Sequence, residues 1–158
     1  MNNLERAIET TEMIRDALAA EIVVAREERV LIRGMDIDGL FLRAAKRAEF
    51  NQTTATLQQE LAQSLGETAR AFGLTQVTLE GLKGRAPEAG QRMANVLAEV
   101  RALAAALAEL DSLNRMLGQR ALSYVRAHLA VLSPKPSAYD RRGGSAADTR
   151  ASTVVRVA

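Results

Sequence analysis

The sequence has neither cysteine nor tryptophan, and its 158 residues include only three prolines and one histidine. Without cysteine there is no disulfide scaffold and no thiolate metal site, and the composition is compatible with the cytoplasm. Aromatic residues make up 3% and apolar residues 47%, with abundant alanine, which favours closely packed helices. No apolar run reaches about eighteen residues, so we expect no stable insertion into a membrane. The prediction is an all-α, cytoplasmic protein.

The residues that carry most catalytic chemistry are scarce. His128 is the single histidine, and neither a cysteine nor a second histidine is available to share a metal ion with it. Asp36 and Asp38 resemble the start of a calcium loop, but the third ligand and the distal glutamate are missing, so a helix cap explains them better. No phosphate-binding glycine loop is present. We therefore expect no enzymatic activity, no cofactor and no metal site.

Apolar residues recur at helical spacing over most of the chain, which predicts helices rather than strands. The first helix carries two adjacent apolar stripes, and two stripes imply two helical neighbours. Asp36 or Asp38 should cap the second helix. Thr75 should cap a short helix, and Pro87 should be the first residue of the last helix. The predicted helices cover residues 3–33, 37–65, 75–82 and 87–132, arranged as an elongated antiparallel three-helix bundle, or helical hairpin, with a long C-terminal helix.

The longest apolar stripe lies in the C-terminal helix, where spacings of three and four alternate. Such a heptad seam must meet another helix. Asn114 is a polar residue within it, and a buried asparagine fixes register at a cost in stability, so we favour this structural role over contact with a partner. The seam comprises Met93, Val96, Val100, Leu103, Leu107, Leu110, Asn114, Leu117, Ala121, Tyr124, His128 and Val131. The main stripe of the first helix comprises Leu4, Ile8, Leu18, Ile22, Ala25 and Ile32, and the inner face predicted for the second comprises Leu40, Phe41, Ala44, Ala48, Ala55, Ala62 and Leu65.

The last part of the chain differs from the rest in composition. We predict a helical bundle over residues 1–132 and a flexible basic tail over residues 133–158. The tail has five basic against two acidic residues, whereas the preceding part is close to neutral, which argues against nucleic-acid binding by the folded part. Tyr139 lies in the tail, where no core is available to bury it. An aromatic side chain in such a segment is a candidate docking residue.

The last helix and the tail together carry a longer pattern. It consists of Asp111-Ser-Leu-Asn114-Arg-Met-Leu117, Leu129-Ala-Val-Leu132, a proline-containing spacer, Ser137-Ala-Tyr139-Asp-Arg-Arg-Gly143, and a closing Val154-Val-Arg-Val157. This pattern resembles the FlgN family of flagellar type III export chaperones. The sequence departs from the family at Asp111, where family members have an asparagine.

The resemblance implies a cytoplasmic chaperone that binds the assembly-prone C-terminal helices of hook-associated (hook–filament junction) proteins. Such a chaperone keeps these clients from polymerising early and delivers them to the flagellar export apparatus. By this resemblance Tyr139 would contact the export gate. Client contacts would fall on Leu117, Leu122, Val125, Leu129 and Leu132. Two other functions stay open from the residues alone: a self-associating helical scaffold, with a homodimer as one form, and a bundle that coats a lipid or polymer surface.

Overall fold

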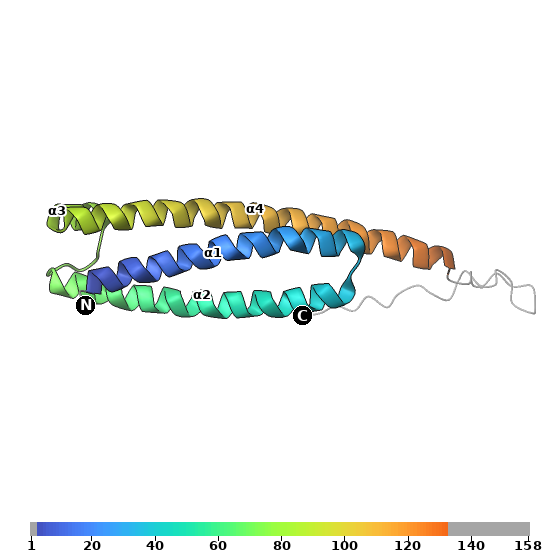
Figure 1. Ribbon diagram of the computed structural model, residues 1–158, viewed down its shortest axis with the longest axis horizontal. Coiled ribbons are helices and arrows are strands. Elements are labelled where there is room, and N and C mark those ends of the chain that lie inside the picture. Colours follow the sequence, from blue (N-terminus) through green and yellow to red (C-terminus); the bar gives the residue numbers. More distant parts are fainter. Residues whose placement is uncertain (1–2, 133–158) are drawn as a thin grey trace, which may run out of the picture. The chain divides into compact units, whose positions relative to one another are not determined.

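The structure, a computed structural model, describes residues 3–132. The chain divides into two units, residues 1–121, which we call the bundle unit, and residues 122–158, which we call the C-terminal unit. All secondary structure in the described residues is helical, which confirms the predicted all-α class. The helices are α1 (Asn3–Gly34), α2 (Ile37–Ala71), α3 (Leu79–Arg85) and α4 (Pro87–Leu132) (Figure 1). The predicted tail, with Tyr139, lies outside the described residues, and its boundary stays a prediction.

Local sequence signals account for most of the helix ends. The Asp36 Oδ1 atom accepts a hydrogen bond from the Gly39 backbone N–H at 2.9 Å, so Asp36, and not Asp38, caps α2. Pro87 begins α4, as predicted, because its fixed φ suits the first helical turn and its missing N–H is not needed there.

Two predicted boundaries are wrong. α2 continues through Gly66 to Ala71, because an isolated glycine weakens a helix without ending it. The chain turns instead at Gly73, whose φ of 65° is the left-handed conformation that glycine adopts without steric cost. The cap of α3 is Thr78, whose Oγ1 accepts a hydrogen bond from the Gly81 N–H at 3.1 Å, and not Thr75.

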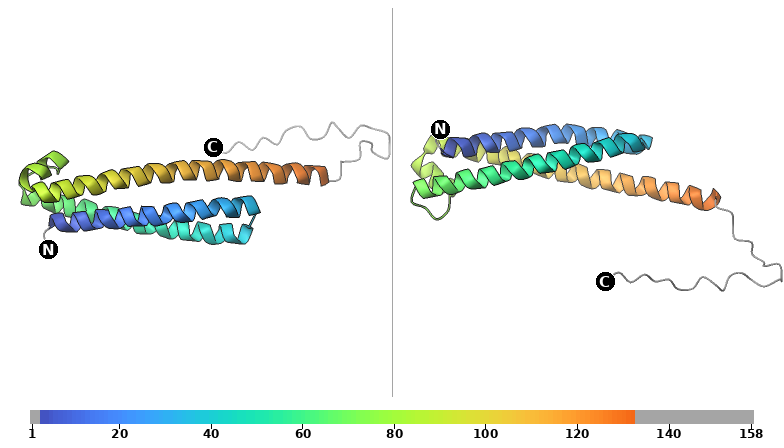
Figure 2. Two further views of the ribbon diagram at one scale, coloured as in Figure 1. Left: turned by 45° about the horizontal axis from the view of Figure 1, so that its top comes forward. Right: turned by 90° about the horizontal axis from the view of Figure 1, so that it is seen from below.

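Three long helices lie side by side in the bundle unit (Figure 2). Ion pairs fix their directions, because Arg92 and Glu99 of α4 meet Glu5 and Arg15 of α1 in ascending order. α1 and α4 are therefore parallel. α2 runs antiparallel to both, since it follows the short turn after α1. The bundle unit is thus the predicted three-helix bundle, and α3 lies in the connection from α2 to α4.

The bundle unit has two apolar clusters. One cluster contains Ile14, Leu18, Ile22, Ala25, Leu57 and Leu107, and the other contains Leu4, Ala7, Ile8, Leu82 and Met93. Both draw their α1 residues from the two adjacent stripes that the sequence predicts, and every residue of the main stripe is buried. The first cluster joins α1, α2 and α4. In the second cluster, Leu82 of α3 packs against residues of α1 and α4.

The predicted inner face of α2 is wrong for most of its residues, although Leu40 and Leu65 are half-buried. Phe41, which should be buried, is 73% exposed, and the alanines of that face are exposed as well. The buried residues of α2 include Arg43, Leu57, Ser64 and Thr68. They keep heptad spacing, but three of the four are polar, so an apolar pattern does not reveal the face.

The seam predicted in α4 is confirmed over the bundle unit. Its members from Met93 to Ala121 are buried or half-buried. Its last three members, Tyr124, His128 and Val131, are exposed and belong to the C-terminal unit.

Gly90 generates the first prediction, because α4 passes close to α3 at this residue. A Cβ atom at Gly90 would lie 2.7 Å from the Lys83 backbone nitrogen, and backbone cannot move aside easily. We expect Gly90→Ala to lower the free energy of unfolding by about 1–3 kcal/mol, measured by urea denaturation. Gly66→Ala is the matched control: nothing lies within 4 Å of its Cβ position, so alanine should raise the free energy of unfolding by about 0.5–1 kcal/mol. A stabilised Gly90→Ala variant would contradict this account of the packing.

Candidate functional site

The described part of the C-terminal unit is a helical segment with an apolar surface. None of residues 122–132 is buried, and Arg126 is the only charged residue among them. The exposed large apolar side chains of this segment are Leu122, Tyr124, Val125, Leu129, Val131 and Leu132. A surface helix usually exposes charged and polar residues, so this concentration of exposed apolar side chains makes the segment the candidate binding surface.

Four of the five predicted client-binding residues lie on this segment. Leu122, Val125, Leu129 and Leu132 alternate in spacings of three, four and three, which places them on one side of the helix. We call these four residues the apolar face. Leu129 is 58% exposed and Leu132 is 78% exposed. Leu117 differs, because it belongs to the bundle unit and is half-buried there.

The single histidine lies on the same segment. The His128 ring centroid is 4.2 Å from that of Tyr124, and His128 Nδ1 lies 3.1 Å from the Tyr124 carbonyl oxygen. Both contacts are within one helical turn. In the described residues, no group of three or more His, Cys, Asp or Glu side chains is placed to hold a metal ion.

Asn114 is buried in the bundle unit, 2% exposed. Its Nδ2 donates a hydrogen bond to the Ala25 carbonyl oxygen at 2.7 Å, which joins α4 to α1. Its Oδ1 accepts a longer hydrogen bond, 3.4 Å, from Arg29 Nε. The amide is therefore satisfied inside the bundle, in the position that a register-fixing residue would take. The register function itself stays a prediction.

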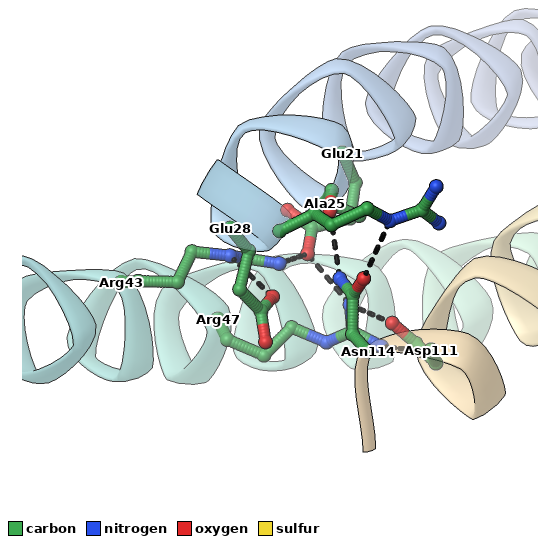
Figure 3. Close-up of polar contacts among 8 residues, drawn as sticks. Glu21, Ala25, Glu28, Arg43, Arg47, Asp111 and Asn114 are labelled. Atoms are coloured by element: carbon green, nitrogen blue, oxygen red, sulfur yellow. Dashed lines mark hydrogen bonds and ion pairs between the residues drawn. The ribbon is translucent and has the colours of Figure 1, made fainter. Parts of the chain in front are cut away.

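Asn114 lies beside a buried network of ion pairs (Figure 3). The Glu21 carboxylate accepts hydrogen bonds from Arg43, and from Arg47 at 2.7 Å. Arg47 also donates to Asp111 at 3.2 Å, which connects α2 to α4. Arg43 Nε donates to Glu28 at 3.0 Å. We call Glu21, Glu28, Arg43, Arg47, Asp111 and Asn114 the polar layer.

The charges of the polar layer are held largely out of water. Glu21 and Arg43 are each 5% exposed. Burial lowers the pKa of the Arg47 guanidinium, but its hydrogen bonds to Asp111 and Glu21 outweigh burial, so the pKa lies above its ordinary value. A buried charge is tolerated only when it is paired and hydrogen-bonded, and here each ion has at least one partner.

Sequence reasoning missed the polar layer apart from Asn114. A signal was present: Glu21 falls within the buried stripe of α1, between Leu18 and Ala25. Arg43 and Arg47 are four residues apart, so they lie on one face of α2. A search for apolar periodicity skips these positions, whereas a search for opposite charges at seam spacing would have paired them.

A groove of about 490 Å³ opens onto the polar layer within the bundle unit. It is lined by Glu28 and Ile32 of α1, Leu40, Arg43, Ala44 and Arg47 of α2, and Asp111, Asn114, Arg115 and Gly118 of α4. We call it the α2–α4 groove. The α2 and α4 residues in it each follow one helical face.

These features define a class of protein: a helical bundle with an exposed apolar helical surface. No helix in residues 3–132 is long and apolar enough to cross a membrane. The FlgN protein family matches residues 1–147 of the chain. The chain therefore belongs to the FlgN family, a family of flagellar export chaperones. No match was found among curated proteins or among solved structures.

The polar layer generates the second prediction. Glu21→Ala removes the carboxylate that Arg43 and Arg47 share, so Arg43 keeps only Glu28 and Arg47 keeps only Asp111 as an ion-pair partner. We expect the free energy of unfolding to fall by about 1.5–3 kcal/mol, measured by denaturant titration. Glu99→Ala is the control, because it breaks an ion pair to Arg15 at 3.5 Å between exposed or half-exposed side chains and should change stability little. Equal effects of the two substitutions would show that the polar layer contributes no more to the free energy of unfolding than a surface ion pair does.

Proposed function

We propose that this chain binds the C-terminal, assembly-prone helices of hook-associated proteins in the cytoplasm, prevents their premature polymerisation and delivers them to the flagellar export gate. Membership of the FlgN family supports the chaperone class. The single observation that carries the client site is the apolar face of the C-terminal unit.

The apolar face suits a helical client. Leu122, Val125, Leu129 and Leu132 have the spacing at which one helix packs into the groove of another. A client helix that polymerises through its own apolar face finds a substitute partner on such a surface. Binding therefore covers the client's assembly surface and the chaperone's exposed leucines together, and both lose apolar contact with water.

A self-associating scaffold is the main alternative. The segment from Leu122 to Leu132 provides about three helical turns. Specific interfaces usually bury about 800 Å² on each partner, more than so short a helix pair supplies easily. This favours an occupant that brings further surface of its own, as a client would.

The apolar face is tested by the double substitution Leu122→Asp and Leu129→Asp. Two carboxylates on this face would have to be desolvated on binding, so we expect capture of purified hook-associated proteins to fall at least about tenfold. Helicity by circular dichroism should be unchanged, because both residues are exposed.

Val23→Asp with Val30→Asp is the matched control. These two residues are also seven apart and exposed, but they lie on α1 of the bundle unit. Capture should survive in this variant. Undiminished capture by the Leu122/Leu129 variant would reject the apolar face, and concentration-dependent oligomers with no capture would favour the scaffold.

Tyr139 is the proposed contact with the export gate, by resemblance to the family. We expect Tyr139→Ala to weaken binding to purified export-gate protein while capture of the client persists. Tyr139→Phe keeps the ring and removes the hydroxyl group, so it separates the contribution of contact area from that of a hydrogen bond. Full gate binding by a chain that lacks residues 133–158 would overturn the assignment of delivery to the tail.

A further inference from the structure

The α2–α4 groove has arginine hydrogen-bond donors that no acceptor in residues 3–132 is recorded to use. Its two carboxylates, Glu28 and Asp111, already pair with Arg43 and Arg47. Arg115 is exposed, and among the described residues no carboxylate forms an ion pair with it. An acidic group entering the groove would therefore meet an available arginine and carboxylates that are already neutralised.

Arg43 provides a second, independent observation. Its side chain is 5% exposed and lines the groove. Its Nη1 atom is buried and has no hydrogen-bond acceptor in the described residues. A buried donor without an acceptor destabilises the bundle unit. An acceptor oxygen from a partner would relieve that cost once the Arg43 side chain turned this atom toward the groove.

The shape of the groove suits a helix. Its α4 lining repeats at Asp111, Asn114, Arg115 and Gly118, a pattern that follows one helical face. Ala44 and Gly118 have the smallest side chains of the lining. Nothing lies within 4 Å of the position that a Cβ atom would take at Gly118. Small residues of this kind let a second backbone approach closely.

We propose that the α2–α4 groove is a second docking site for the client, which accepts a helix that carries an aspartate or glutamate side chain. Arg115 binds the carboxylate, and Arg43 lies in the lining of the same groove with one donor that can turn toward it. The site rests on the proposed chaperone function, but it lies in the bundle unit and uses none of the four residues of the apolar face. The groove would select client helices that carry an acidic residue, whereas the apolar face selects them only by their apolar side chains.

Charge separates this occupant from two segments of the chain itself, the tail and residues 122–132. The tail over residues 133–158 has five basic against two acidic residues, so its net charge opposes entry beside Arg115. Residues 122–132 contain Arg126 and no acidic residue, so the same segment of a second copy provides no carboxylate either. An acidic partner helix complements the groove better than both.

The shape is tested by Gly118→Leu. The leucine side chain extends into open space in the groove and disturbs no neighbour within 4 Å of its Cβ position. We expect the Kd for a purified hook-associated protein to rise at least about tenfold, measured by isothermal titration calorimetry. Gly66→Leu is the matched control, because Gly66 is another helix-interior glycine with open space, outside the groove. Its Kd should stay within about twofold of that of the unaltered chain.

The charge selection is tested by Arg115→Glu, with Arg120→Glu as the control. Both residues are exposed on α4 of the bundle unit, and both substitutions change the net charge equally, but only Arg115 lines the groove. We expect Arg115→Glu alone to weaken client binding. Replacing the acidic residues of the client's C-terminal helix with their amides should weaken binding to the unaltered chain and remove the difference between the two variants.

The outcomes distinguish this proposal from the proposed function. If the unaltered chain captures client, and Gly118→Leu and Arg115→Glu bind as tightly as their controls, the groove proposal fails and the chaperone function stands. If the unaltered chain captures no hook-associated protein, both fail. A Gly118→Leu variant that changes only the oligomeric state, measured by analytical ultracentrifugation, would identify a second copy as the occupant and overturn the proposal.

Discussion

The packing of the bundle unit depends most on the ion pairs that the Glu21 carboxylate forms with Arg43 and Arg47. Glu21 lies at a position of the α1 stripe that an apolar residue would ordinarily occupy, and it binds two arginines of α2 at once. Arg47 then reaches Asp111, so one connected set of charges holds α1, α2 and α4. An apolar contact tolerates sliding along a helix, whereas a buried ion without its partner is strongly unfavourable. The network therefore favours an alignment of the three helices in which each of these ions has a partner, and Asn114 adds a directional hydrogen bond beside it.

The sequence alone was sufficient for α1 and for the bundle part of α4, because their buried stripes are apolar and regular. It was insufficient for α2. There the heptad positions are occupied by Arg43, Ser64 and Thr68, while the large apolar side chain of Phe41 points to solvent. Hydrophobic periodicity measures burial only where buried residues are apolar. In α2 several buried positions hold charged or hydroxyl side chains and an apolar side chain is exposed. Contacts with the other helices, and not the apolar pattern, therefore determine which face of α2 is buried.

The two candidate binding surfaces also differ in how far the sequence indicates them. The residues of the apolar face came from the family resemblance, since Leu122 and Leu129 each lie one residue beyond the predicted seam positions Ala121 and His128. The α2–α4 groove was not accessible to sequence reasoning, because it needs residues from three helices and the pairing state of each charge. Asp111 is instructive: it gives Arg47 a second carboxylate partner beside Glu21 and so connects α4 to α2, a contact that no apolar pattern indicates.

The order of the elements has a consequence for synthesis on the ribosome. Arg43 follows Glu21 by 22 residues, whereas Asn114 follows Ala25 by 89. The α1–α2 hairpin can therefore form its ion pairs early, while the α1 stripe has no α4 to cover it until much more of the chain has been made. Charge pairing lets the hairpin align without apolar contacts from α4, and contacts of such long sequence separation form slowly. The nascent chain thus passes through a period in which the apolar stripe of α1 lacks the cover that α4 later provides.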